Sequence, residues 1–244
     1  MQKTLPPSNP PWKVADGIII LIMINVLAFA FKIFGHQWVI SAAGRFPGGV
    51  SDLNVLLVSS FIQTALFLLF IGYYVFFKYK ISFKYLGLVK TRFGHWLKIG
   101  FINGIILFFA VVIMGIIINW VSPIEVKPQP IAEIIMSAQT NWEMVIPFIV
   151  ASIFAPISEE LFFRGFLYPS LRSKIGILRG MVVTSLIFGG LHFDLVRMIP
   201  LAFGGIWLNW LYEKSGSIYT SIVAHSVWNG IMTMLIFLIP SAMT

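Results

Sequence analysis

Residues 148–167 read FIVASIFAPISEELFFRGFL, an apolar stretch of membrane-spanning length that nevertheless contains three charged side chains. Two are the adjacent acids Glu159 and Glu160, and the third is Arg164. An ionisable side chain near the centre of a bilayer costs about 2.5–3.5 kcal/mol or more. Three such residues within one turn and a half of helix therefore indicate a functional site inside the membrane.

The composition of the whole chain is that of a polytopic membrane protein. Of its 244 residues, 58% are hydrophobic and 11% are charged, whereas soluble domains contain about 25% charged residues. The net charge is +8, but the basic residues lie between apolar segments, where they act as topology signals and contact anionic lipid. We therefore expect a lipid bilayer and no nucleic acid as partner. The chain has no cysteine, so any metal must be bound by His, Asp or Glu.

Seven apolar segments are long enough, or nearly so, to cross about 30 Å of hydrocarbon. They predict an all-α fold, a bundle of about seven transmembrane helices, because an isolated strand cannot satisfy its backbone in lipid. Pro200 and the pair Gly204-Gly205 interrupt the sixth segment, which makes it the weakest. The predicted spans are residues 15–34, 53–77, 97–120, 143–168, 176–193, 196–212 and 216–239.

We expect one transmembrane domain over residues 1–244. Residues 1–141 would supply N-terminal helices and loops, to which the sequence assigns no role. Residues 142–240 would form a catalytic core of four helices around the charged stretch.

The distribution of Lys and Arg predicts how the chain is oriented. If the seven spans are correct, four of the seventeen basic residues lie on the side opposite the N terminus, and Arg164 lies within the membrane. Because cytoplasmic connections carry an excess of Lys and Arg, we expect an integral protein of a bacterial cell membrane with its N terminus in the cytoplasm. The twelve residues on the predicted cytoplasmic side are Lys3, Lys13, Lys78, Lys80, Lys84, Lys90, Arg92, Lys98, Arg172, Lys174, Arg179 and Lys214.

Two later spans each contain one histidine at a depth that matches Glu159. Glu159, His192 and His225 each lie 11 to 13 residues from the nearest predicted cytoplasmic Arg or Lys, and Asn229 lies 15 residues away. At 1.5 Å per residue, these side chains lie roughly 16–23 Å below that interface. We therefore predict that three helices meet around one water-reachable cavity.

Helical spacing separates the two acids. Glu160 and Arg164 are four residues apart, so they share a helix face and can form an ion pair. Glu159 is turned about 100° away from Glu160 and is then the freer acid. Two carboxylates this close in a low-dielectric site should have separated proton affinities. An acid poised as a base at neutral pH is what the activation of water requires.

These residues form three spaced motifs. Residues 159–164 match E-E-x-x-x-R, residues 188–192 match F-x-x-x-H and residues 225–229 match H-x-x-x-N. In this order they resemble the CPBP intramembrane proteases, also called the Abi or CAAX-protease-like family. That family includes the eukaryotic endopeptidase that trims prenylated CAAX tails, and bacterial proteins linked to peptide maturation and bacteriocin self-immunity. The resemblance covers residues 156–231, and its specificity comes from three motifs in order, each in its own predicted span.

The resemblance implies an intramembrane endopeptidase that hydrolyses a peptide bond in a membrane-associated or lipidated peptide. It implies that Glu159 with His192 activates the attacking water. It also implies that His225 and Asn229 stabilise the oxyanion of the tetrahedral intermediate.

The same resemblance implies that Glu160 and Arg164 hold the first core helix in place. It also raises the question of zinc, because the family has long been called metalloprotease. Glu159, His192 and His225 are the candidate metal ligands, since Glu and His are ordinary zinc ligands. The one-helix zinc signature H-E-x-x-H is absent from the sequence. A metal-free glutamate mechanism uses the same residues, so both alternatives stay open.

Two other functions compete with proteolysis. A non-catalytic immunity or interaction protein could share the fold, but a pure binding protein need not keep a base and an oxyanion group together. Full biological function in a Glu159→Gln variant would favour that alternative. A proton-coupled transporter could also place acids and histidines in its spans. We rank the transporter third because the sequence shows no internal repeat.

Other polar or small residues in the spans are interpreted as structural. Gly100 and Gly104 form a G-x-x-x-G pattern that predicts close packing of two helices. The amide side chains in the spans are expected to make hydrogen bonds between helices; these are Asn25, Gln63, Asn103 and Asn209.

Overall fold

The computed structural model of the chain describes residues 9–90, 92–121 and 130–238. Every regular element in these ranges is a helix, which confirms the all-α fold class for the described part of the chain. Lys3 and Lys127, both used in the orientation argument, lie outside the described residues, as do the last residues of the predicted seventh span and of the predicted core.

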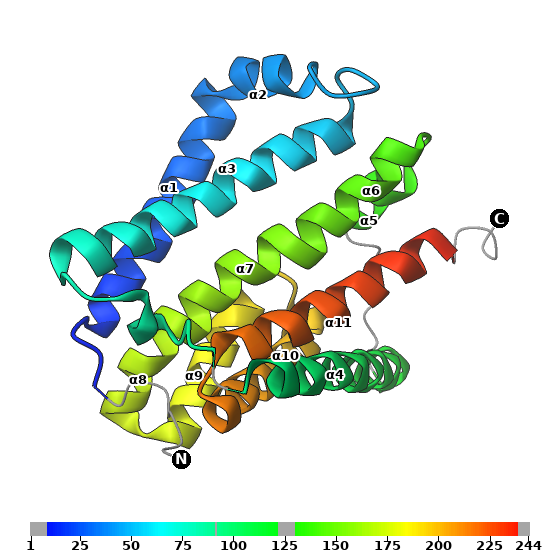
Figure 1. Cartoon of the computed structure of the whole chain (residues 1–244). Coiled ribbons are helices and arrows are strands. Elements are labelled where there is room, and N and C mark those ends of the chain that lie inside the picture. Colours follow the sequence, from blue (N-terminus) through cyan, green and yellow to red (C-terminus); the bar gives the residue numbers. More distant parts are fainter. Residues whose placement is uncertain (1–8, 91, 122–129, 239–244) are drawn as a thin grey trace.

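The N-terminal half forms a helical hairpin and a long separate helix (Figure 1). Ser51 begins the second arm of the hairpin, because its side chain accepts a hydrogen bond from the backbone N–H of Asn54. The elements are α1 (Val14–Phe34), α2 (His36–Ala43), α3 (Asp52–Gly72), the π-helical turn η1 (Tyr73–Lys78), the 3-10 helix η2 (Phe83–Leu86) and α4 (Phe93–Val121).

The C-terminal half is built around one continuous helix that carries the charged stretch (Figure 1). Its parts are α6 (Asn141–Ile149), the π-turn η3 (Val150–Phe154), α7 (Ala155–Glu160), the π-turn η4 (Leu161–Leu167) and α8 (Tyr168–Ile175). The remaining helices of this half are α5 (Pro130–Met136), α9 (Ile177–Gly190), α10 (Leu195–Ser215) and α11 (Ile218–Leu238).

Local sequence explains where this continuous helix begins, widens and ends. Thr140 and Glu143 cap its first turn reciprocally. Pro156 has no N–H for the carbonyl four residues earlier, and the wide turn η3 lies directly before it. Such π-turns are frequent at functional sites. Gly176, with a φ of 83°, ends the helix in a conformation that favours glycine.

Five helices in the described ranges are long and apolar enough to cross a membrane, where the sequence predicts about seven. They are Val14–Phe34, Asp52–Lys78, Phe93–Val121, Asn141–Ile175 and Ile218–Leu238. The predicted spans 176–193 and 196–212 do form helices, α9 and α10. However, α9 has 14 residues, which is about 21 Å, and α10 is less apolar. These two helices pack on each other, so their contacting faces need not be apolar enough for lipid.

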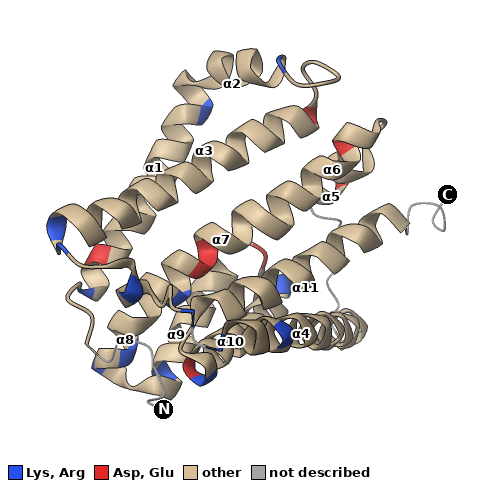
Figure 2. Ribbon diagram, in the orientation of Figure 1, with Lys and Arg blue, Asp and Glu red and all other residues tan. Residues whose placement is uncertain are grey.

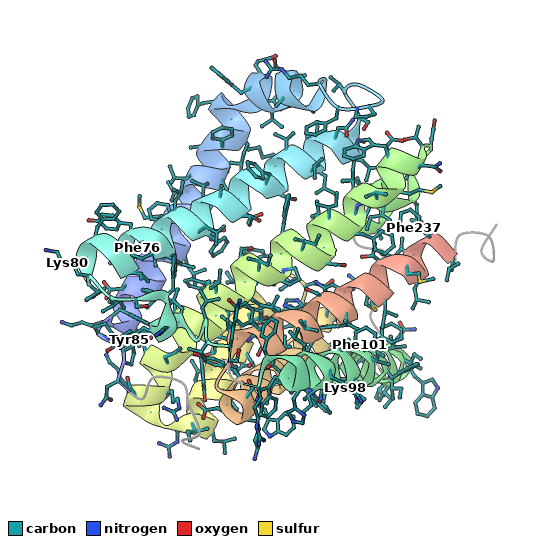
Figure 3. All side chains as sticks on the ribbon, in the orientation of Figure 1. Phe76, Lys80, Tyr85, Lys98, Phe101 and Phe237 are labelled. Carbon is teal, nitrogen blue, oxygen red and sulfur yellow. The ribbon has the colours of Figure 1, made fainter. Side chains whose placement is uncertain are left out.

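Charged and apolar side chains are distributed as a membrane protein requires. Figure 2 shows Lys and Arg concentrated at the end of the bundle where α1 begins and α8 meets α9. Few basic residues lie at the opposite end, near α2. Large apolar side chains are exposed along the helices, including Phe76 and Phe101 (Figure 3), and would face acyl chains. This charge distribution agrees with the predicted orientation, which itself stays a prediction.

The predicted glycine face packs α4 against α11. A Cβ at Gly100 would lie 2.7 Å from the carbonyl oxygen of Thr220, and one at Gly104 would lie 2.6 Å from that of Ala224. Neither distance is compatible with a side chain, so the predicted close packing is confirmed. It fixes α4 directly beside the helix that carries His225.

Two of the four amide side chains make the predicted hydrogen bonds between helices. Oδ1 of Asn103 on α4 accepts from the indole N–H of Trp207 on α10 at 3.1 Å. Nδ2 of Asn209 on α10 donates to Oγ of Ser185 on α9 at 3.1 Å. Asn25 and Gln63 behave differently, as described below.

Candidate active site

Glu160 and Arg164 form the predicted ion pair in the interior of the bundle. Nη1 of Arg164 lies 2.8 Å from Oε1 of Glu160, and both side chains are fully buried. Nη2 of Arg164 donates to the carbonyl oxygen of Gly205 at 3.1 Å, which ties η4 to α10. The guanidinium also lies 4.9 Å from the ring centroid of Phe188. The predicted pairing is therefore confirmed, and it connects three helices.

Glu160 also contacts His225, a link that the sequence analysis missed. Nδ1 of His225 lies 2.8 Å from Oε1 of Glu160. Because an ionised carboxylate can only accept, Nδ1 of His225 carries the hydrogen of this contact, and Nε2 is the other ring nitrogen. That Nε2 lies 3.8 Å from Oε2 of Glu159. The distance exceeds a direct hydrogen bond, and both atoms can contact the same water molecule.

His192 is fixed by its own backbone turn. Its Nδ1 lies 2.9 Å from the carbonyl oxygen of Phe188. A carbonyl oxygen only accepts, so Nδ1–H donates and Nε2 stays available for substrate or water. The Phe188 ring contacts both imidazoles edge-on, at centroid distances of 5.1 Å to His192 and 5.9 Å to His225. The shared face of Phe188 and His192, predicted from their spacing, is confirmed.

Glu159 and His192 line one cavity of about 330 Å³. The side chain of Glu159 is 26% exposed, whereas that of Glu160 is completely buried. This difference confirms that Glu159 is the freer acid. One wall of the cavity comes from η3, α7, η4 and α9 with the turn after it, and the other wall comes from α1 and α3. The first and third helices of the chain are thus part of the site, which the sequence did not predict.

Asn229 lies apart from Glu159. Its Nδ2 donates to the carbonyl oxygen of Ala151 at 2.9 Å. It lines a second cavity, of about 370 Å³, to which Glu159 does not contribute. His192 is the predicted site residue that borders both cavities, and His225 is almost fully buried between its partners. The oxyanion role that the resemblance implies for His225 and Asn229 therefore stays a prediction.

The predicted zinc ligands do not form a metal-binding group in this arrangement. Across residues 9–90, 92–121 and 130–238, no three His, Asp or Glu side chains are placed so that they could hold a metal ion. Glu159 and His225 approach each other, but the third candidate, His192, does not complete such a set with them. No step of the mechanism proposed below therefore uses a metal, and zinc stays a prediction that a chelator can test.

Gly204 and Gly205 support the site, although the sequence marked them only as an interruption. A Cβ at Gly205 would lie 2.9 Å from the side chain of Ser185, and one at Gly204 would lie 2.7 Å from the Trp228 ring. Trp228 in turn stacks on His225 at a centroid distance of 5.5 Å. Adjacent glycines in an apolar helix are a signal of close helix packing, and this signal could have identified both positions.

Comparison with known proteins agrees with this region of the chain. Residues 141–231 match the family described as type II CAAX prenyl endopeptidase Rce1-like. The Bacillus subtilis (strain 168) protein named "Putative membrane peptidase YdiL" is 33% identical over 81 residues. That alignment covers 33% of this chain and 33% of the relative, so it spans only a third of the relative's length. No solved structure matches the chain.

Proposed function

Because residues 141–231 match the family described as type II CAAX prenyl endopeptidase Rce1-like, we propose that the protein is an intramembrane endopeptidase. Its substrate is a membrane-associated or lipidated peptide. One observation carries the proposal: a partly exposed acid, Glu159, shares a cavity with His192 and is backed by the buried pair of His225 and Glu160. An acid beside an oriented imidazole is suited to general base catalysis.

In the proposed reaction, Glu159 removes a proton from a water molecule in the cavity. Nε2 of His192 accepts a hydrogen bond from the same water and orients it. The water oxygen attacks the carbonyl carbon of the substrate, and the proton held at Glu159 passes to the leaving nitrogen as the C–N bond breaks. The products are a carboxylic acid and an amine, which together contain all the atoms of the water molecule. The acid then gives its proton to the amine, which leaves a carboxylate and an ammonium group.

His225 acts through Glu159 in this scheme. Its Nε2 faces Oε2 of Glu159 at 3.8 Å while Glu160 holds its Nδ1–H. A carboxylate that fixes the tautomer and rotation of an imidazole is the arrangement used in hydrolytic triads. We assign His225 to positioning Glu159 through a water molecule that both side chains can contact.

The decisive experiment is cleavage of membrane-embedded peptides by the purified protein in liposomes, followed by mass spectrometry. The panel should contain the same peptides with and without a lipid modification. We expect the Glu159→Gln variant to lose about 10²–10⁴-fold in kcat while it keeps the wild-type melting temperature. Glu133→Gln, on the exposed surface of α5, is the matched control and should retain wild-type cleavage. Wild-type turnover by Glu159→Gln would refute the assignment.

We further propose that the N terminus lies in the cytoplasm of a bacterial cell and that α2 lies on the opposite side. The proposal is supported by the collection of Lys and Arg at one end of the bundle (Figure 2). The chain has no cysteine. A single cysteine introduced at the exposed position Lys80 or Trp38 is therefore the one thiol in the protein, and its labelling shows on which side of the membrane that position lies. A membrane-impermeant thiol reagent should label Trp38→Cys on intact cells and leave Lys80→Cys unlabelled. The reverse pattern would invert the topology.

A further inference from the structure

The cavity wall opposite Glu159 carries polar side chains beside the apolar side chains of Leu21, Ile24, Leu56 and Phe67. It is contributed by α1 and α3, which lie outside the family-matched residues 141–231; α3 packs against α7, and α1 packs against η4. The polar residues in this wall are Asn25 on α1 and Ser60, Gln63 and Thr64 on α3. Polar side chains in spans usually mark a functional surface.

We refer to these four cavity-lining polar residues as the strip. Ser60, Gln63 and Thr64 stand at positions i, i+3 and i+4, so they share one face of α3. Oγ1 of Thr64 donates to the carbonyl oxygen of Phe154 at 3.4 Å, which holds this face against the wide turn η3. Thr64 therefore fixes the distance between the strip and Glu159.

The other members of the strip do not hold helices together. Nδ2 of Asn25 donates to the carbonyl oxygen of Leu21 in its own helix at 2.8 Å. Gln63 is exposed and makes no hydrogen bond to any described residue, in contrast with Asn103 and Asn209. The predicted interhelical role is thus filled by Asn103 and Asn209 but not by Asn25 or Gln63. Their remaining donors and acceptors point to a ligand in the cavity.

The chemistry of the reaction requires such donors and acceptors. A peptide inside a membrane satisfies its backbone by forming a helix, and its carbonyl carbons are then shielded from attack. Unwinding the segment frees N–H and C=O groups, and an unpaired group of this kind is energetically unfavourable away from water. Carboxamides offer both a donor and an acceptor, and a hydroxyl offers the same in a smaller group. A strip of these side chains can pair with an extended backbone.

We propose that Asn25, Ser60 and Gln63 bind the backbone of an unwound substrate segment and hold its scissile carbonyl toward Glu159. The proposal rests on the proposed endopeptidase function and adds how the substrate is chosen. Because the strip recognises backbone groups, it selects peptides that unwind easily in the membrane, such as those with glycine or proline beside the scissile bond. The residues that make this selection lie outside the family domain.

The test compares Gln63→Leu and Ser60→Ala with the matched control Ser59→Ala. Ser59 precedes Ser60 on α3 and does not line the cavity of Glu159; it lines a neighbouring cavity, which Gln63 also borders. Each lost hydrogen bond contributes about 0.5–1.5 kcal/mol, so we expect KM for a cleaved peptide to rise about 3- to 10-fold. We expect kcat to stay within about twofold, since these contacts bind substrate and transition state alike. Ser59→Ala should leave both constants unchanged.

A binding measurement separates this inference from the proposed function. In the Glu159→Gln background, the Kd of the uncut peptide should rise by the same factor when Gln63→Leu is added. A KM and Kd that stay within twofold of wild type in both Gln63→Leu and Ser60→Ala overturn the inference, and so does a loss confined to kcat. If Gln63→Leu shows no cooperative melting transition and is therefore unfolded, Asn25→Leu replaces it, and the same changes in KM and Kd are expected. A wild-type protein that cleaves no peptide would instead count against the proposed function.

Discussion

Nδ1 of His225 and Oε1 of Glu160 lie 2.8 Å apart, although 65 residues separate them in the chain. The same carboxylate oxygen also binds Arg164 at 2.8 Å. One buried acid thus joins the guanidinium on η4 to the imidazole on α11. We infer that Glu160 both stabilises the bundle and orients the imidazole that faces Glu159.

Replacing Glu160 by glutamine should impair catalysis. A neutral amide cannot impose one tautomer on His225, because it can present either its oxygen or its NH₂ group to Nδ1. In a hydrolytic triad the equivalent change lowers kcat by about 10⁴-fold, and we expect a loss of about 10²–10⁴-fold here. The measurement is kcat on a peptide that the wild type cleaves, together with the melting temperature. A Glu160→Gln variant with wild-type kcat would show that His225 needs no orienting carboxylate.

Replacing Arg164 by alanine should destabilise the fold. The substitution leaves the carboxylate of Glu160 buried without its guanidinium, and breaking a buried pair in this way costs about 3–5 kcal/mol. The free energy of unfolding in detergent or bilayer measures the effect. Arg179→Ala is the matched control because Arg179 is exposed at the start of α9, and it should change stability by no more than about 0.5 kcal/mol. Equal stability of the two variants would contradict the pairing.

Replacing Gly104 by leucine should separate α4 from α11. A side chain there meets the carbonyl oxygen of Ala224, next to His225, and overpacking typically costs about 1–3 kcal/mol. We also expect kcat to fall, because a shift of α11 moves His225 relative to Glu159. Gly115→Leu on the same helix is the control, since nothing lies within 4 Å of a Cβ at Gly115. Comparable melting temperatures and kcat values for the two variants would argue against this packing.

Chelators should leave peptide cleavage unchanged. The arrangement of Glu159, His192 and His225 does not provide a metal-binding group, so the proposed water activation uses protein side chains alone. Cleavage by protein dialysed against a strong zinc chelator, with its zinc content determined in parallel, is the measurement. Loss of activity that added zinc restores would establish a metal mechanism and would require His192 to move toward the other two side chains.

Relationships within one helix could be predicted from the sequence. The pairing of Glu160 with Arg164, the shared face of Phe188 and His192, and the greater freedom of Glu159 all follow from 3.6 residues per turn. The meeting of Glu159 with His225 also agrees with the depth that their distance from basic residues predicted. These inferences depend on position along a helix axis or on rotation about it, which the sequence contains.

Relationships between helices could not be predicted in the same way. Depth does not determine the rotation of one helix against another, so the sequence did not show that Nδ1 of His225 faces Glu160. For the same reason it did not show that Asn229 turns toward Ala151. Apolar composition also does not distinguish a face that meets lipid from one that meets another helix. The two spans that the sequence predicts for α9 and α10 therefore stay predictions.

The cavity with two unrelated walls has a consequence for engineering. A fragment trimmed to residues 141–231 would retain Glu159, His192 and His225 but would lose α1 and α3. Lipid acyl chains would then contact the ionisable carboxyl group of Glu159, and exposing such a group to hydrocarbon is energetically costly. Grafting the core of a relative onto these two helices, or exchanging the helices between relatives, is the safer way to redirect such a hydrolase to new peptides.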